Sequence, residues 1–237
     1  MTELPQLLGD PIRLVRMTAA RTLAGPGESR LDAAQLGQFN AALEEYVAAQ
    51  RFNADRPEAH GNLGSLHAVR SDVVAAEAEY RAALAIDPLF VPARVNLADL
   101  LRAAGRETEA AATLREGIAV APGSAELHHA LGLSLVRSGE TNAALAELET
   151  AARAAPEVAR YPYVYAIALH STGRAEAAIK VLDEALVRHP VNREMLTALV
   201  TINLEAGRKD EALQYVAKLV EAYPNDPEVS QLLQSMR

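Results

Sequence analysis

Histidine is the residue type through which this chain could most readily do chemistry, because its ring binds metals and exchanges protons near neutral pH. The chain has six histidines, of which His60 and His67 lie seven residues apart and His128 and His129 are adjacent. A zinc site on one helix needs two histidines four residues apart with an acid nearby, and none of these pairs has that spacing. We therefore interpret His60, His67 and His128 as residues that pack between helices, and we expect no metal site.

Other reactive groups are missing or have the wrong spacing. The chain has no cysteine, which excludes disulfides, thiolate metal sites, cysteine nucleophiles and covalently attached c-type haem within it. The stretch Gly25-Pro26-Gly27 lacks the Lys and the following Ser or Thr of a phosphate-binding loop, and no Gly-x-Ser-x-Gly motif occurs. We interpret the carboxylates, such as Glu44 and Glu45, as solvated helix surface. No catalytic residue, cofactor or enzymatic activity is expected.

Composition favours helices and limits the partners. Half of the residues are apolar, yet only 4% are aromatic and Trp is absent, so Ala and Leu dominate, and both are strong helix formers. The net charge of −8 disfavours a nucleic-acid partner. The longest stretch without a charged residue, 161–173, is too short to span a bilayer, so we expect no membrane insertion. No signal peptide is visible, and a soluble chain without cysteine suits both cytoplasm and periplasm.

Three kinds of residue recur along the chain with one common period, without insertions or deletions. These are Pro88, Pro122, Pro156, Pro190 and Pro224; Ala42, Ala76, Ala110, Ala144, Ala178 and Ala212; and Gly105, Gly139, Gly173 and Gly207, with Ser71 at the matching earlier position. Proline stops a helix, glycine permits a tight turn, and alanine lets a neighbouring backbone come close. Each period therefore predicts two helices joined by a turn.

Larger apolar residues keep the same period and give each predicted helix a buried face. Leu63, Leu97 and Leu131 recur on the first helix, and Tyr80, Leu114, Leu148, Leu182 and Val216 recur on the second. This pattern, with Asn62-Leu63-Gly64, Ala76, Tyr80, Ala83 and Pro88, resembles the tetratricopeptide repeat, a helix–turn–helix unit of the same length. The resemblance implies an all-α fold, a right-handed α-solenoid of stacked repeats. Five repeats fit, at 57–90, 91–124, 125–158, 159–192 and 193–226. Where the family's first helix carries Trp, this chain has His60, Arg94, His128, Pro162 and Leu196.

The two ends of the chain differ from the repeats. Residues 26–56 are expected to form a linker and a half-repeat helix with Asp32 as its N-cap. Residues 227–237 should form a capping helix, whose apolar positions are Val229, Leu232, Leu233 and Met236. Residues 1–25 resemble part of a HEAT repeat, with Asp10 as N-cap and Pro11 at the first helical position. Because one solenoid unit cannot bury its apolar face alone, we expect this chain to be a piece of a longer protein.

The resemblance also implies where a partner would bind, on the concave face lined by the first helices. Carried over position by position, the central binding residues are Asn62, Ser65, Asn96, Asp99, Arg102, His129, Arg137, Tyr163, Ile167 and His170. Asn62 and Asn96 stand one repeat apart and are interpreted either as amides that hold a peptide backbone or as ordinary polar surface. The cations of relatives that clamp an acidic C-terminal tail are missing here.

Aromatic residues gather at one place, Tyr161, Tyr163 and Tyr165. Of these, Tyr163 should face the groove beside Ile167 and His170, and Tyr165 should face the core. The patch is interpreted either as an anchor for a partner or as filling for the space of missing tryptophans.

Three functions follow as alternatives. The first is a non-catalytic scaffold that binds a protein or peptide partner in the groove. The second is a C-terminal assembly domain of a larger bacterial enzyme or multihaem electron-transfer protein. The order of a HEAT-like unit and then tetratricopeptide repeats, with the run at 49–60, looks similar to the C-terminal part of some bacterial multihaem cytochromes. The third is homo-oligomerisation through the ends of the solenoid.

Overall fold

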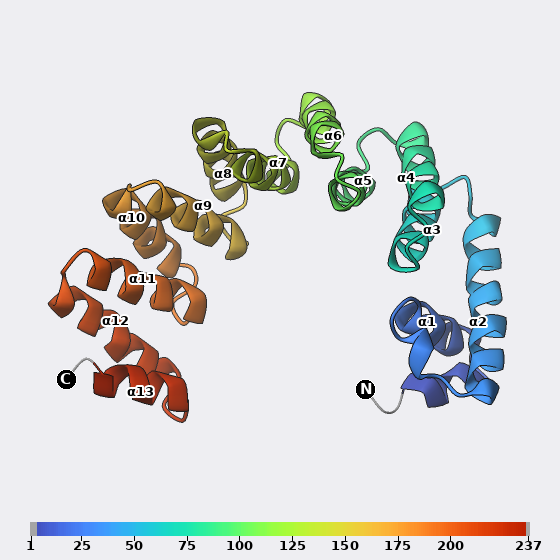
Figure 1. Cartoon of the computed structure of the whole chain (residues 1–237), viewed down its shortest axis with the longest axis horizontal. Coiled ribbons are helices and arrows are strands. Elements are labelled where there is room, and N and C mark those ends of the chain that lie inside the picture. The colour runs from blue at the N-terminus through green and yellow to red at the C-terminus, as the bar shows by residue number, and fades with distance from the viewer. Residues whose placement is uncertain (1–3, 236–237) are drawn as a thin grey trace. The chain divides into compact units, whose positions relative to one another are not determined.

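The computed structural model describes residues 4–235, and this part of the chain consists of helices and connecting turns without a strand (Figure 1). It divides into two compact units, the first ending at Pro122 and the second beginning at Gly123. The first unit contains η1 (Leu4–Gly9), α1 (Arg13–Leu23), η2 (Glu28–Arg30), α2 (Ala33–Phe52), α3 (Pro57–Val69), α4 (Val73–Ile86), α5 (Val91–Ala103) and α6 (Glu107–Val120). The second contains α7 (Ala125–Ser138), α8 (Thr141–Ala154), α9 (Arg160–Ser171), α10 (Ala175–Leu186), α11 (Arg193–Glu205), α12 (Lys209–Ala222) and α13 (Pro227–Ser235).

From α3 to α12 the helices form consecutive pairs, and the alanine register lies where the two helices of a pair meet. The five alanines of these pairs, and Ala42 at the equivalent position of α2, are each at most 1% exposed, and the recurring apolar residues of both helices are buried as predicted. The facing positions are matched in size. A Cβ added to Gly64 would lie 2.6 Å from the ring of Tyr80, and one added to Gly132 would lie 2.7 Å from Leu148 Cγ. The small residues thus let large side chains of the second helix reach the first helix.

The predicted turn residues join the two helices of each pair. Gly105, Gly139, Gly173 and Gly207 have φ between +75° and +78°, and Ser71 has φ +62° at the equivalent place. In this left-handed region a side chain crowds the backbone, which is why glycine is preferred. Ser71 is the one non-glycine residue with positive φ in the part of the chain that is described.

The beginnings of two N-terminal helices test the predicted caps. Asp32 caps α2 as expected, accepting a hydrogen bond from the Gln35 amide while the Gln35 side chain accepts from the Asp32 amide. The prediction for α1 was wrong, because this helix begins at Arg13 and its N-cap residue is Ile12. The Asp10 carboxylate instead accepts a bond of 2.7 Å from the Ile12 amide, two residues on, which places Pro11 in a bend before the helix.

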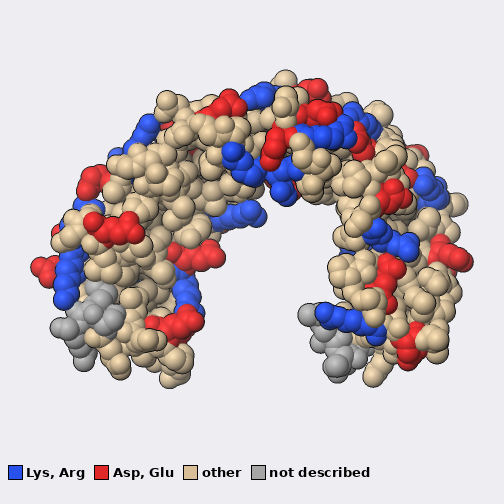
Figure 2. All heavy atoms as spheres, in the orientation of Figure 1, with Lys and Arg blue, Asp and Glu red and all other residues tan. Residues whose placement is uncertain are grey.

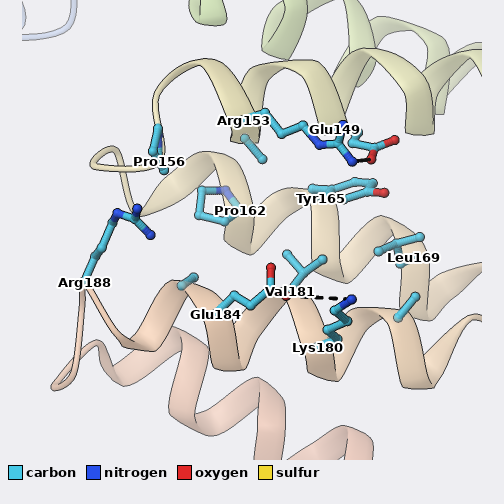
Figure 3. Close-up of a pocket in the computed structure, with 13 residues that line it drawn as sticks. Glu149, Arg153, Pro156, Pro162, Tyr165, Leu169, Lys180, Val181, Glu184 and Arg188 are labelled. Carbon is cyan, nitrogen blue, oxygen red and sulfur yellow. Dashed lines mark ion pairs between the residues drawn. The ribbon is translucent and has the colours of Figure 1, made fainter.

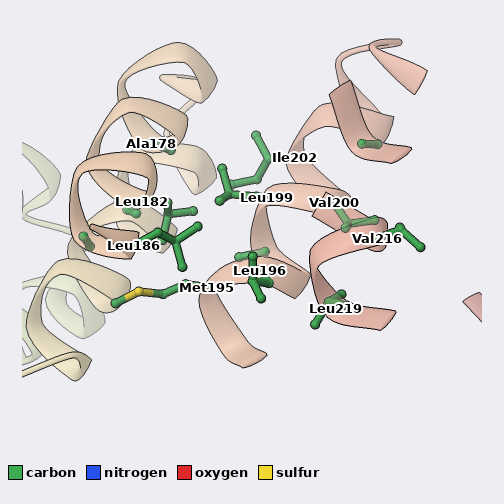
Figure 4. Close-up of a cluster of buried hydrophobic side chains, with 14 of the residues drawn as sticks. Ala178, Leu182, Leu186, Met195, Leu196, Leu199, Val200, Ile202, Val216 and Leu219 are labelled. Carbon is green, nitrogen blue, oxygen red and sulfur yellow. The ribbon is translucent and has the colours of Figure 1, made fainter. Parts of the chain in front are cut away.

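Apolar side chains from successive pairs join into continuous cores. In the first unit, η1 and α1 pack against α2 around Leu8, Ala20 and Phe39, each at most 2% exposed. In the second unit, α10, α11 and α12 share a cluster shown in Figure 4. The α13 helix covers the end of this cluster through buried Val229, with Leu232 and Leu233 partly buried against it. Met236, predicted for the same face, lies outside the described residues. None of the described helices is both long and apolar enough to cross a membrane.

Candidate functional site

The first helices of successive pairs present one set of predicted binding residues in each unit, which we call the first-helix face of that unit. In the first unit this face lies on α3 and α5, which contact each other. Asn62 is exposed, and its amide donates a hydrogen bond of 3.1 Å to the Gln50 side chain of α2. Asn96, one repeat later, is half-buried, and its side chain makes no hydrogen bond within the described residues. Of the two amides, Asn96 is the one that still lacks a partner.

The other predicted residues of this face already have partners in the chain. The Ser65 hydroxyl donates to the Gly61 carbonyl at 2.9 Å and accepts from the Tyr80 hydroxyl at 3.2 Å. Ser65 therefore holds the ring that packs against Gly64, and burial raises the pKa of Tyr80. Asp99 and Arg102 form an ion pair of 3.4 Å one turn apart on α5, where both remain accessible.

In the second unit the predicted residues lie on α7 and α9, and His129 is the most buried of them. The residue is 6% exposed, and neither ring nitrogen has a hydrogen-bond partner in the described structure. The Tyr161 ring lies 4.8 Å away, centroid to centroid. Burial, helped by the nearby charge of Arg160, lowers the pKa of His129 to about 4, so the ring is neutral at pH 7. The sequence predicted a surface residue at this position, and the structure places it beneath a tyrosine.

The remaining residues of this face are more accessible. Ile167 is 37% exposed, so it offers an apolar contact at the surface. Tyr163 is partly buried against the apolar cluster of this unit. The His170 ring is 2.9 Å from the Glu205 carboxylate of α11. Arg137 is exposed near the end of α7.

Pairs of histidine and glutamate are the feature that the sequence interpretation missed. The Nδ1 atom of His60 lies 2.6 Å from the Glu79 carboxylate, and its Nε2 atom lies 3.0 Å from the Ala54 carbonyl. His128 and Glu147 repeat the pair at 2.5 Å in the second unit. The interpretation of the carboxylates as solvated surface was wrong for Glu79, which is 8% exposed and also binds Arg51 at 2.7 Å.

These pairs fit a structural role, because both ring nitrogens of His60 are already occupied by groups of the protein. A signal for them was present in the sequence, since the histidine and the glutamate of the first repeat both recur at the same positions of the third. No cluster of three or more potential metal ligands occurs among the described residues.

Charged side chains of both signs are interspersed on the visible surface of each unit (Figure 2). Neither first-helix face is dominated by one sign of charge, because Asp99 and Arg102 neutralise each other and Glu205 lies against His170. The faces therefore suit hydrogen bonding and apolar contact better than the capture of a highly charged ligand.

Comparison with protein families agrees with the helix pairs. One tetratricopeptide repeat model matches residues 70–133 and 173–236, which together exceed half of the chain. A second tetratricopeptide repeat model matches residues 31–89 and 129–188. Comparison with curated protein sequences gave no match.

Several solved structures share the fold. PilW, a type IV pilus biogenesis factor, has a TM-score of 0.65 and 17% identity over 95% of this chain and 100% of its own. MamA has a TM-score of 0.60 and 21% identity over 71% of this chain and 92% of its own. YrrB, described as a TPR protein with an unusual peptide-binding site, has a TM-score of 0.58 and 16% identity over 80% and 97% of the two chains. At such identities the likeness concerns the fold alone. With more than half of its residues matched by a family model and its helices paired at the period of the sequence repeat, the chain belongs to the tetratricopeptide repeat family.

Proposed function

We propose that this chain is a non-catalytic scaffold for protein–protein interaction and that it binds a peptide or partner segment on its first-helix faces. Stacked helical repeats offer extended surfaces that proteins of this architecture use for binding. The observation that carries the proposal is the side-chain amide of Asn96, half-buried on α5 without a hydrogen bond in the described structure. An amide both donates and accepts, so it matches the N–H and C=O groups of an extended peptide backbone.

The first-helix face of the second unit, considered by itself, offers an apolar contact. Ile167 is exposed on α9, and Tyr163 lies on the same helix with its ring partly buried. A rigid aromatic ring beside an exposed aliphatic side chain is a common anchor in interfaces. The proposed contacts are Asn62, Asn96, Asp99, Arg102, Arg137, Tyr163, Ile167 and His170. Ser65 and His129 are proposed to support the faces, because Ser65 holds Tyr80 and His129 lies under Tyr161.

The test begins with peptides selected from a random library on the immobilised chain. The affinity of one selected synthetic peptide is then measured by fluorescence anisotropy for the unchanged chain and for Asn96→Ala and Ile167→Ser. We expect Asn96→Ala to weaken a peptide that binds on the first unit, and Ile167→Ser one that binds on the second, each by about tenfold, the effect of losing one good contact. Asn40→Ala on α2 and Val74→Ser on α4 are matched controls, since both residues are exposed away from the first-helix faces. Unchanged affinity in both test variants would remove the faces from the proposal.

The other two functions predicted from the sequence, an assembly domain of a larger protein and a homo-oligomerisation module, stay predictions. Light scattering of the purified chain at two concentrations tests the second of these directly, because self-association depends on concentration.

A further inference from the structure

A hollow of about 390 Å³ opens in the second unit between α8, α9 and α10 (Figure 3). Pro162 and Tyr165 from α9 and Val181 from α10 line its apolar centre. None of the residues proposed for the first-helix faces contributes to its wall. Ligand pockets in proteins usually measure about 300–1,000 Å³, so this hollow has room for one large side chain rather than for a whole peptide.

The hollow arises from two substitutions within the repeat pattern. It opens where residues 162 and 181 face each other, and the same two positions can be compared in every repeat. The pairs are His60 with Glu79, Arg94 with Thr113, His128 with Glu147, Pro162 with Val181, and Leu196 with Tyr215. In the first and third repeats the two side chains hydrogen-bond, and in the second the Arg94 guanidinium reaches the Thr113 carbonyl at 3.4 Å. Two short apolar side chains replace these longer partners in the fourth repeat, and the space between them stays open.

The rim of the hollow has an excess of positive charge, although the whole chain carries −8. Three cations, Arg153, Lys180 and Arg188, stand there against two carboxylates, Glu149 and Glu184. Arg153 is held by Glu149 at 2.5 Å, and Lys180 is only loosely paired with Glu184 at 3.9 Å. Arg188 forms no ion pair with any described residue, and its side chain stands at the edge of the hollow (Figure 3). One cation is therefore available to an incoming anion.

We propose that this hollow is a second binding site, which accepts one large apolar side chain from an acidic segment of a partner protein. The anchor side chain would lie against Pro162, Tyr165 and Val181, and carboxylates beside it would meet Arg188 and Lys180. An apolar floor under a cationic rim selects such a segment over a basic one, because like charges repel on approach. The site goes beyond the first-helix faces, since none of their proposed contact residues lines it and most of its wall comes from the second helices α8 and α10. It could bind a different partner at the same time.

Short synthetic peptides test the proposal. One carries a central Trp between glutamates, a second replaces the Trp by Ala, and a third replaces the glutamates by lysines. Binding to the full chain is followed through backbone amide shifts in two-dimensional NMR, at up to about 1 mM peptide, a range that detects weak complexes. We expect the Trp–Glu peptide to shift amides of α8, α9 and α10 around the hollow. Loss of the anchor should weaken binding at least about tenfold, because a fully buried large side chain contributes that much.

Variants of the chain locate the site. Pro162→Trp restores the residue that the family carries at this position and fills the hollow, so it should abolish the shifts. Val181→Phe fills the hollow from the other side, where the fifth repeat already carries Tyr215, and it serves if Pro162→Trp does not fold. Arg188→Glu should weaken binding about tenfold by reversing the unpaired charge. Arg115→Glu makes the same change at an exposed position of α6 and should have no effect.

Three results would overturn the proposal. They are the absence of shifts with the Trp–Glu peptide, equal binding of the lysine peptide, and binding that persists in both filled variants. Shifts on Tyr163 and Ile167 instead would support the first-helix face while overturning this second site, so the two proposals can fail separately. Self-association of the chain that Pro162→Trp removes would identify a second copy as the occupant and would also contradict the acidic peptide.

Discussion

At the repeat position that holds Trp in the family, the first unit uses polar contacts and the second unit changes to apolar packing. In the first unit the position occupied by Trp in the family holds His60 and Arg94, and both use polar partners. Glu79 joins three helices there, because it binds His60 of α3 and Arg51 at the end of α2 while it sits on α4 itself. In the second unit the same position changes from His128 to Pro162 and then to Leu196, which is fully buried. Polar linkage gives way to apolar packing along the chain.

Ion pairs between the second helices of successive repeats occur in both units, so the contrast is limited to the position of the missing Trp. Arg106 precedes α6 and reaches back to Glu77 of α4 at 2.6 Å, and Arg208 precedes α12 and reaches back to Glu176 of α10 at the same distance. Hydrogen bonds from Arg106 and Arg81 lower the pKa of Glu77. The repeat thus tolerates an ion pair, an apolar pair or a hollow at the position that holds Trp in the family, provided that the recurring alanines and the turn residues are kept.

The largest effect is expected where apolar packing replaces the polar pair. Leu196→Ala in α11 should lower the free energy of unfolding by about 3 kcal/mol, because a fully buried leucine leaves a cavity among Leu182, Leu199 and Val216. Urea denaturation followed by circular dichroism measures this change. Leu204→Ala on the same helix is the control, since Leu204 is 40% exposed and should contribute much less. Equal effects of the two substitutions would contradict the assignment of the core.

The second effect concerns His129, whose folded-state pKa of about 4 lies below its ordinary value of 6.5. As the pH falls, the unfolded chain binds a proton at this ring before the folded chain does. The free energy of unfolding is therefore unaffected by protonation of the ring above about pH 6.5 and decreases from there towards pH 4. The difference corresponds to about 3 kcal/mol at most. Urea midpoints measured between pH 7 and pH 4 should therefore fall less steeply for His129→Phe than for the unchanged chain. Parallel slopes in the two proteins would show that His129 is not buried as a neutral ring.

The third effect tests the polar linkage of the first unit. Glu79→Gln keeps the shape of the side chain but removes its charge from Arg51 and His60, and it should reduce stability by about 2 kcal/mol. The matched change in the second unit, Glu147→Gln, should have a smaller effect, because the Glu147 side chain is 28% exposed. Thermal or urea unfolding of both variants gives the comparison. A larger loss in Glu147→Gln than in Glu79→Gln would reverse the proposed contrast between the units.

The repeat period made most of the fold predictable, because it constrains positions where only one kind of residue works. Alanine between close helices and glycine in a left-handed turn leave few alternatives, and both registers were found where expected. The start of α1 was misplaced because Asp10 can cap a helix or bend the chain two residues on, and the sequence does not distinguish these bonds.

The candidate site was harder to predict, because it depends on which side chains find partners. Ser65 and Asn96 both fall on first-helix positions, yet Ser65 is occupied by Tyr80 and Asn96 is not. Glu79 lies 19 residues from His60 on another helix, so neither helical periodicity nor its charge indicated burial. The replacement of Trp by Pro162 was visible in the sequence, but the hollow required knowing that Val181 faces it.

The smallest effect concerns the turn that opens the second helix in the first full repeat of each unit, where the first unit has Ser71 and the second has Gly139. Ser71 has φ +62° and Gly139 has φ +78°. Ser71→Gly should therefore stabilise the chain by about 1 kcal/mol, since it relieves a side chain in the left-handed region. Gly139→Ser should destabilise it by a similar amount, although no atom lies within 4 Å of the added Cβ.

Because the strain comes from the backbone and not from a clash, the two substitutions should be nearly equal and opposite in urea denaturation. Gly37→Ala is the control, since Gly37 lies inside α2 with open space around it and without positive φ. There alanine should stabilise by about 1 kcal/mol through its helix propensity alone. If Ser71→Gly destabilised the chain, a contact of Ser71 in the first unit would have to offset its strained backbone. The turns of the two units would then differ in their contacts, as the positions of the missing Trp do.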